Sequence, residues 1–124
     1  MDRKLIEKII GKRNYVNLND EIYILREITN IMRQNIQNNI AFTDELINEV
    51  NIKASKSKSI VSEIIDGLEN DSFVLGYTNS KNYLLKYLKD VNNNLVGIIE
   101  SSNPFKYDEL IIYTNGLIDL ILLF

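Results

Sequence analysis

Residues 19–68, NDEIYILREITNIMRQNIQNNIAFTDELINEVNIKASKSKSIVSEIIDGL, decide the fold of this chain. Apolar residues recur there in steps that are nearly all three or four: Leu25, Ile28, Met32, Ile36, Ile40, Ile47, Val50, Ala54, Val61, Ile64 and Leu68. Because an α-helix turns once every ~3.6 residues, this spacing keeps them on one helical face. The stretch therefore predicts helix, and the rest of the chain is expected to cover its apolar side.

The central stretch contains two helix-start signals. Asn19 is a good N-cap and is followed by acidic residues, which predicts a helix running at least to Ile40. Thr43, with Asp44 and Glu45 after it, repeats the signal. A single helix of about 50 residues would be unusually long, so we favour a restart or kink near Thr43. One long helix over 19–68 is the alternative. The polar run 53–59 fits either a thin place in a helix or a loop.

The flanking segments also show helical periodicity. Residues 3–10 gather isoleucine and leucine on one side, and Gly11 is expected to end that helix before a polar connector over 12–18. Ser80 is expected to cap a later helix. That helix carries a heptad stripe: Leu84, Leu88, Val91, Leu95 and Ile98.

The last segment allows two interpretations. Asn103 suits an N-cap and Pro104 the first helical position, which favours a helix over 104–123. Its expected inward residues are Tyr107, Leu110, Ile111, Thr114, Leu117, Ile118 and Ile121. Asn115-Gly116 between two apolar runs is also a strong hairpin signal, so paired strands over 110–123 are the alternative.

Together these patterns predict a single all-α domain over residues 1–124. We expect an antiparallel bundle of four to five helices, with one long central helix or a kinked helix pair. With 45% hydrophobic and 25% charged residues, the chain has the composition of a globular protein.

The composition removes most enzyme classes. The chain has no cysteine and no histidine, which excludes Cys/His zinc sites, imidazole-based triads and thiol redox pairs. Carboxylate pairs such as Glu45 with Glu49 are expected to be solvated surface acids. The glycines are scattered and form no phosphate loop. We therefore expect a non-enzymatic protein with no catalytic residues, metal or cofactor; an enzyme using carboxylates alone is the alternative.

Charge and hydropathy bear on partners and location. The net charge is −3, and the basic clusters at 3–13 and 53–58 are not interleaved with aromatic residues, so we do not expect nucleic-acid binding. No apolar run approaches the ~18 residues that a spanning helix needs, and no secretory signal is visible. We expect a cytoplasmic protein that does not bind membranes.

Another protein is the expected partner. The candidate contact residues are tyrosines and apolar residues of the last two helices: Tyr83, Tyr87, Tyr107, Leu120, Leu123 and Phe124. Residues 117–124 hold more apolar side chains than one helical stripe can hide, which suggests a partner groove or a homodimer.

Residues 56–122 resemble the small helical chaperones that hold flagellar and type III secretion subunits before export. The resemblance is carried by the helix–loop–helix–loop–helix pattern, by IVSEIIDGL at 60–68, and by the segment from Tyr83 to Tyr87. The N-terminal signature of that family is missing. The resemblance implies a cytoplasmic adaptor or export/assembly chaperone that binds its partner through a helical face. The alternatives are a phage- or virus-encoded inhibitor of a host protein and a membrane-surface helical bundle of the immunity type.

Overall fold

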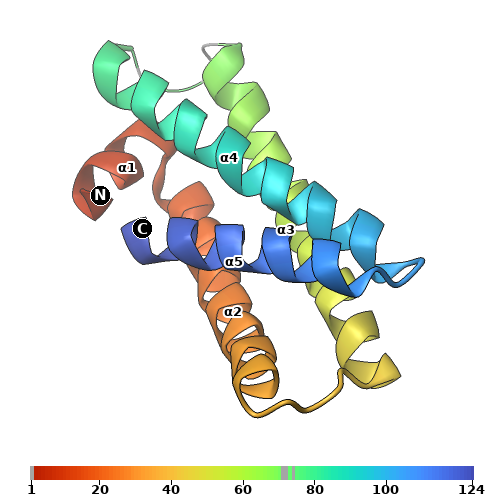
Figure 1. The fold of residues 1–124 in the computed structure, drawn as a ribbon. Coiled ribbons are helices and arrows are strands. Elements are labelled where there is room, and N and C mark those ends of the chain that lie inside the picture. Colours follow the sequence, from red (N-terminus) through yellow and green to blue (C-terminus); the bar gives the residue numbers. More distant parts are fainter. Residues whose placement is uncertain (1, 71–72, 74) are drawn as a thin grey trace.

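The computed structural model describes residues 2–70, 73 and 75–124, and these residues form five helices and no strand. The helices are α1 (Arg3–Ile10), α2 (Lys12–Gln37), α3 (Asp44–Glu69), α4 (Thr78–Ser102) and α5 (Tyr107–Leu123). The predicted all-α bundle is confirmed. In Figure 1, α3 and α4 run side by side in opposite directions, α5 crosses the bundle, and α1 lies beside the start of α4.

The central stretch forms two separate helices. The chain leaves α2 after Gln37, passes through residues 38–43 and restarts at Asp44. Thr43 caps the second helix, because its hydroxyl oxygen accepts a hydrogen bond from the Leu46 N–H at 3.1 Å. The predicted restart is confirmed, and the single long helix is wrong. Ile40, expected on the apolar stripe, lies in the connector and is 54% exposed.

The start of α2 differs from the prediction. No connector spans 12–18, because Gly11 alone separates the two helices with φ 88° and ψ 156°, a conformation that costs glycine little. The Asn14 side-chain amide donates to the Ile10 carbonyl at 2.8 Å, and Leu18 is fully buried. Asn19 is therefore inside α2 and is not its cap. The polar residues of 12–17 lie on the solvent-facing side of the first turns of α2, whose other side packs on the core.

The polar run 53–59 is helical throughout and faces a buried acid. Glu21 on α2 is only 5% exposed. The Ser57 hydroxyl lies 3.2 Å from one Glu21 carboxylate oxygen and also donates to the Lys53 carbonyl at 2.8 Å. Lys56 Nζ lies 3.4 Å from the other Glu21 oxygen. These contacts supply the partners that a buried carboxylate requires, so the polar run joins α3 to α2.

The heptad stripe of α4 forms the centre of the core. All five of its residues are buried, and Leu88 and Leu95 are completely covered. The helix begins at Thr78, two residues before the predicted cap Ser80. Its far end approaches α5 very closely, because a Cβ atom added at Gly97 would lie 2.3 Å from two ring carbons of Tyr113.

The last segment is a helix, so the hairpin alternative is wrong. It begins at Tyr107, however, and Asn103 is the C-cap of α4 instead of an N-cap. Ser101 and Ser102 are still helical, and their hydroxyls donate to carbonyls of the preceding turn of α4. Pro104 lies in the turn between α4 and α5, three residues before the first residue of α5. Tyr107, expected inward, is 44% exposed, whereas Leu110, Thr114, Leu117, Ile118 and Ile121 are buried as predicted.

Candidate functional site

Five of the six predicted contact residues gather where α4 passes the C-terminal end of α5. Tyr83 is 59% exposed and Leu123 is 54% exposed, while Leu120 is half-buried. Tyr87 and Phe124 are buried, so they support this surface from beneath. The sixth residue, Tyr107, lies at the opposite end of α5, where its ring packs 5.5 Å from Phe42 and 6.3 Å from Phe105.

The buried part of this region is an aromatic cluster around Phe124. Its ring centroid lies 6.5 Å from that of Tyr15 and 6.4 Å from that of Tyr87. The Arg3 guanidinium carbon lies 5.8 Å from the same ring. The Tyr87 hydroxyl donates to the Leu120 carbonyl at 2.8 Å. Burial, with a smaller contribution from Tyr83, raises the pKa of Tyr87 well above its ordinary value, so this donor keeps its proton at neutral pH.

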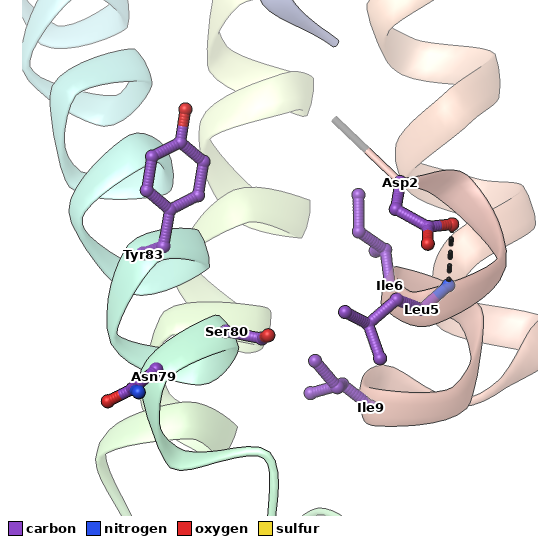
Figure 2. A pocket seen from close by; sticks show the side chains of 7 residues that line it. All are labelled: Asp2, Leu5, Ile6, Ile9, Asn79, Ser80 and Tyr83. Atoms are coloured by element: carbon purple, nitrogen blue, oxygen red, sulfur yellow. Dashed lines mark hydrogen bonds between the residues drawn. The ribbon is translucent and has the colours of Figure 1, made fainter.

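A hollow of about 300 Å³ separates α1 from the start of α4. Its lining residues are Asp2, Leu5, Ile6, Ile9, Asn79, Ser80 and Tyr83. Figure 2 shows Leu5, Ile6 and Ile9 pointing from α1 toward α4, whose Ser80 points back across the gap. The Asp2 carboxylate caps α1 by accepting from the Lys4 and Leu5 N–H groups at 3.1 and 3.2 Å. The floor of this hollow is therefore aliphatic, and its nearest acid is already bonded to the backbone.

A second hollow, of about 190 Å³, is also lined by Tyr83. It is lined by Tyr83, Lys86, Tyr87, Asp90, Leu120 and Leu123, so it contains four of the predicted contact residues. Tyr83 is the residue that both hollows share. We call the two hollows together the Tyr83 channel. It runs along one side of α4, with α1 forming its wall at one end and α5 at the other.

Three lysines line a third hollow, which shares no residue with the Tyr83 channel. Lys4 and Lys8 of α1 and Lys12 at the start of α2 are all exposed, and with Glu7 they line a hollow of about 390 Å³. Leu5 and Lys8 are three residues apart and Lys4 and Lys8 four, so they are neighbours on the helix surface. We call Lys4, Lys8 and Lys12 the lysine stripe. Glu7 lies among these lysines, and the charged residue that lines the aliphatic end of the channel is Asp2.

The α1 side of the channel was not among the predicted contact residues. The periodicity of Leu5, Ile6 and Ile9 predicts an apolar helix face, but it does not say which helix lies opposite. The structure shows that Gly11 joins α1 to α2 and that the helix opposite these residues is α4. No signal in the sequence sets the width of the gap between the two helices.

Two searches of the described residues, one for metal-holding groups and one for membrane spans, gave no candidate. Across 2–70, 73 and 75–124, the acidic side chains form no group of three that could hold a metal ion. Within the same residues, no helix has the length and apolar character to cross a membrane. What the arrangement provides is an aliphatic and aromatic recess beside an exposed tyrosine, which suits the binding of an apolar side-chain cluster.

Searches of protein-family models, of curated proteins and of solved structures find no match to this chain.

Proposed function

We propose that the protein is a non-enzymatic protein-binding module and that its contact surface is the Tyr83 channel. The observation that carries the proposal is the position of Tyr83, which is 59% exposed between two hollows lined mainly by aliphatic and aromatic side chains. Tyrosine at the centre of an apolar recess is typical of the residues that contribute most to protein–protein binding.

The residues beneath the channel support the same function. Tyr87 and Phe124 are held by ring contacts and by the Tyr87–Leu120 hydrogen bond. A surface that is already fixed before binding loses less conformational entropy when a partner docks. The lack of histidine and cysteine in the whole chain leaves binding as the better-supported activity. In a cell, such a module would act as a cytoplasmic adaptor or as a chaperone for export or assembly.

A site-specific photocrosslinker tests the proposal directly. We would replace Tyr83 with p-benzoylphenylalanine in the full chain and irradiate cells that express it. Tyr23 on α2 is the matched control, because it is also a tyrosine and is also 59% exposed. We expect a discrete crosslinked protein at position 83 that is absent at position 23.

The mass of the crosslinked product separates the alternatives. A product of twice the chain mass would show that the channel binds a second copy of this protein. A larger or smaller product would show a different protein as partner. Equal crosslinking at both positions, or none at position 83, would contradict the proposal.

A further inference from the structure

We infer that a hollow between α2 and α5 binds a small organic anion, a carboxylate or a phosphate monoester that carries a short aliphatic group. The hollow has a volume of about 220 Å³ and is lined by Arg26, Thr29, Asn30, Arg33, Ile118, Ile121 and Leu122. It shares no residue with either hollow of the Tyr83 channel. The inference therefore adds a second site and does not depend on the proposed function.

The charged residues that line this hollow are both arginines. Arg26 is exposed and Arg33 is half-buried. The ion pairs found within residues 2–70, 73 and 75–124 are Lys56–Glu21, Lys89–Glu69 and Lys106–Glu109. Neither arginine belongs to these pairs. Two like charges that line one hollow repel each other, and an anion bound between them replaces this repulsion with attraction.

The surroundings of the hollow leave a positive balance of charge. Glu27 and Asp119 are exposed and adjoin lining residues in the sequence, but they neither line the hollow nor form an ion pair within the described part of the chain. Ile121 and Leu122 belong to the last turn of α5, and the carbonyl end of a helix carries a partial charge of about −0.5. That partial charge cannot neutralise two guanidinium groups. The hollow therefore attracts anions although the net charge of the whole chain is −3.

The polar side chains of the hollow supply hydrogen-bond donors from one face of α2. Arg26, Asn30 and Arg33 are separated by four and three residues, so they are neighbours on the helix surface. A guanidinium presents a planar fork of N–H donors that matches the oxygens of a carboxylate or a phosphate. The Asn30 amide can add a further donor, whereas the Thr29 hydroxyl already donates to the Leu25 carbonyl at 2.6 Å.

The α5 side of the hollow is aliphatic and selects the rest of the ligand. Ile118 and Ile121 are only 5% and 3% exposed, whereas Leu122 is 73% exposed. The volume is below the ~300–1,000 Å³ of pockets that hold drug-sized ligands, so the ligand must be small. An anionic group followed by about five carbon atoms would place its oxygens at the arginines and its chain against the isoleucines.

Nuclear magnetic resonance titrations of the isotope-labelled full chain test the inference. The probes are hexanoate and hexyl phosphate. Hexylamine and hexanol keep the aliphatic chain but not the negative charge, and acetate keeps the charge but not the chain. The affinities for hexanoate and hexyl phosphate then distinguish a carboxylate ligand from a phosphate ligand.

Matched variants locate the binding site. Arg26→Gln and Arg33→Gln each remove one guanidinium, and Arg13→Gln is the control, because Arg13 is exposed on the same helix and lines none of the hollows described here. Leu122→Ser removes an aliphatic contact. Its control is Ile112→Ser, since Ile112 is 66% exposed on the same helix and lines none of these hollows. Circular dichroism verifies that each variant remains helical.

We expect hexanoate or hexyl phosphate to shift the amide signals of residues 26–33 and 118–122 and to leave those of residues 79–90, beside the Tyr83 channel, unchanged. Arg26→Gln and Arg33→Gln should each weaken binding about tenfold at low salt and less at high salt, since exposed charges are screened. Arg13→Gln should change it less than about twofold. Leu122→Ser should weaken binding about threefold, and Ile112→Ser should leave it unchanged.

Several results would overturn the inference. These are no shift at the expected residues, equal binding of hexanoate and hexanol or hexylamine, equal binding of hexanoate and acetate, or binding that survives both Arg26→Gln and Arg33→Gln. Flotation with phosphatidylglycerol vesicles that Arg26→Gln abolishes, without a response to the soluble anions, would assign the arginines to a lipid surface instead. The proposed function is tested separately, because the crosslinker at position 83 lies outside this hollow.

Discussion

The close contact between Gly97 and Tyr113 predicts that Gly97→Ala destabilises the wild type but stabilises a variant that lacks the Tyr113 ring. Alanine is about 1 kcal/mol more favourable than glycine inside a helix, so Gly97→Ala, in the C-terminal part of α4, would ordinarily stabilise the protein. Here the new Cβ atom would lie 2.3 Å from Cγ and Cδ1 of the Tyr113 ring. These atoms are at the base of the ring, so a small rotation cannot relieve the clash. Tyr113 must leave the surface of α4.

The cost follows from the burial of that ring. Tyr113 is 37% exposed, so most of its side chain is covered. If displacement returns about 100 Å² of apolar surface to water at ~25 cal/mol/Å², it costs about 2.5 kcal/mol. After the ~1 kcal/mol gain in helix propensity, Gly97→Ala should lower the free energy of unfolding by about 1.5 kcal/mol. In a Tyr113→Ala background the clash is gone, and the same change should raise it by about 1 kcal/mol.

A double-mutant cycle measured by urea unfolding, followed by far-ultraviolet circular dichroism, tests this reasoning. The coupling between the two positions should be about 2.5 kcal/mol. Asn93→Ala, an exposed position on the same helix, is the control and should have the same small stabilising effect in both backgrounds. If Gly97→Ala stabilises the wild type as much as it stabilises Tyr113→Ala, the close approach of α4 and α5 at this point is refuted.

Three further predictions concern the core and its polar contacts. Leu88→Asp places a charge at a completely covered position, so the variant should lack a cooperative unfolding transition by circular dichroism at 25 °C. Lys56→Met leaves the carboxylate of Glu21 without its cation and should cost about 1 kcal/mol in urea unfolding, whereas Lys89→Met removes an exposed pair and should cost less than about 0.5 kcal/mol. Because burial raises the pKa of Tyr87 in the folded state, its contribution to stability is complete below the unfolded-state pKa of about 10 and declines as the pH rises above it. Tyr87→Phe should therefore lose less stability than the wild type between pH 9 and pH 11.

The sequence predicted the structure best at positions where the local pattern is compatible with a single structural role. The heptad residues of α4 could be identified as core from their spacing alone, and Thr43 could be identified as a cap because an acidic first turn follows it. Asn19 and Asn103 misled because asparagine is compatible both with caps and with helix interiors or ends. Their roles depend on packing nearby, such as the burial of Leu18, which local sequence does not encode.

The candidate site was only half predictable for a related reason. The tyrosines and leucines of α4 and α5 are conspicuous in the sequence. The opposite wall comes from Leu5, Ile6 and Ile9 of α1, which Gly11 joins to α2. These residues are more than seventy positions from Tyr83 in the sequence, and local periodicity cannot predict that they lie close to it.

The apolar tail, residues 117–124, contributes more to the core of its own chain than its composition suggests. Its excess of apolar residues favoured a homodimer or a partner groove, yet Ile121 and Phe124 are buried by their own chain. Phe124 in addition joins Tyr15 of α2 to Tyr87 of α4, so the tail is a structural link between helices. The exposed remainder is Leu122 and Leu123, and two side chains cover far less than the surface that a stable dimer buries. The argument for a partner therefore rests on the Tyr83 channel, to which the tail contributes only Leu120 and Leu123 and in which the exposed Tyr83 lines both hollows.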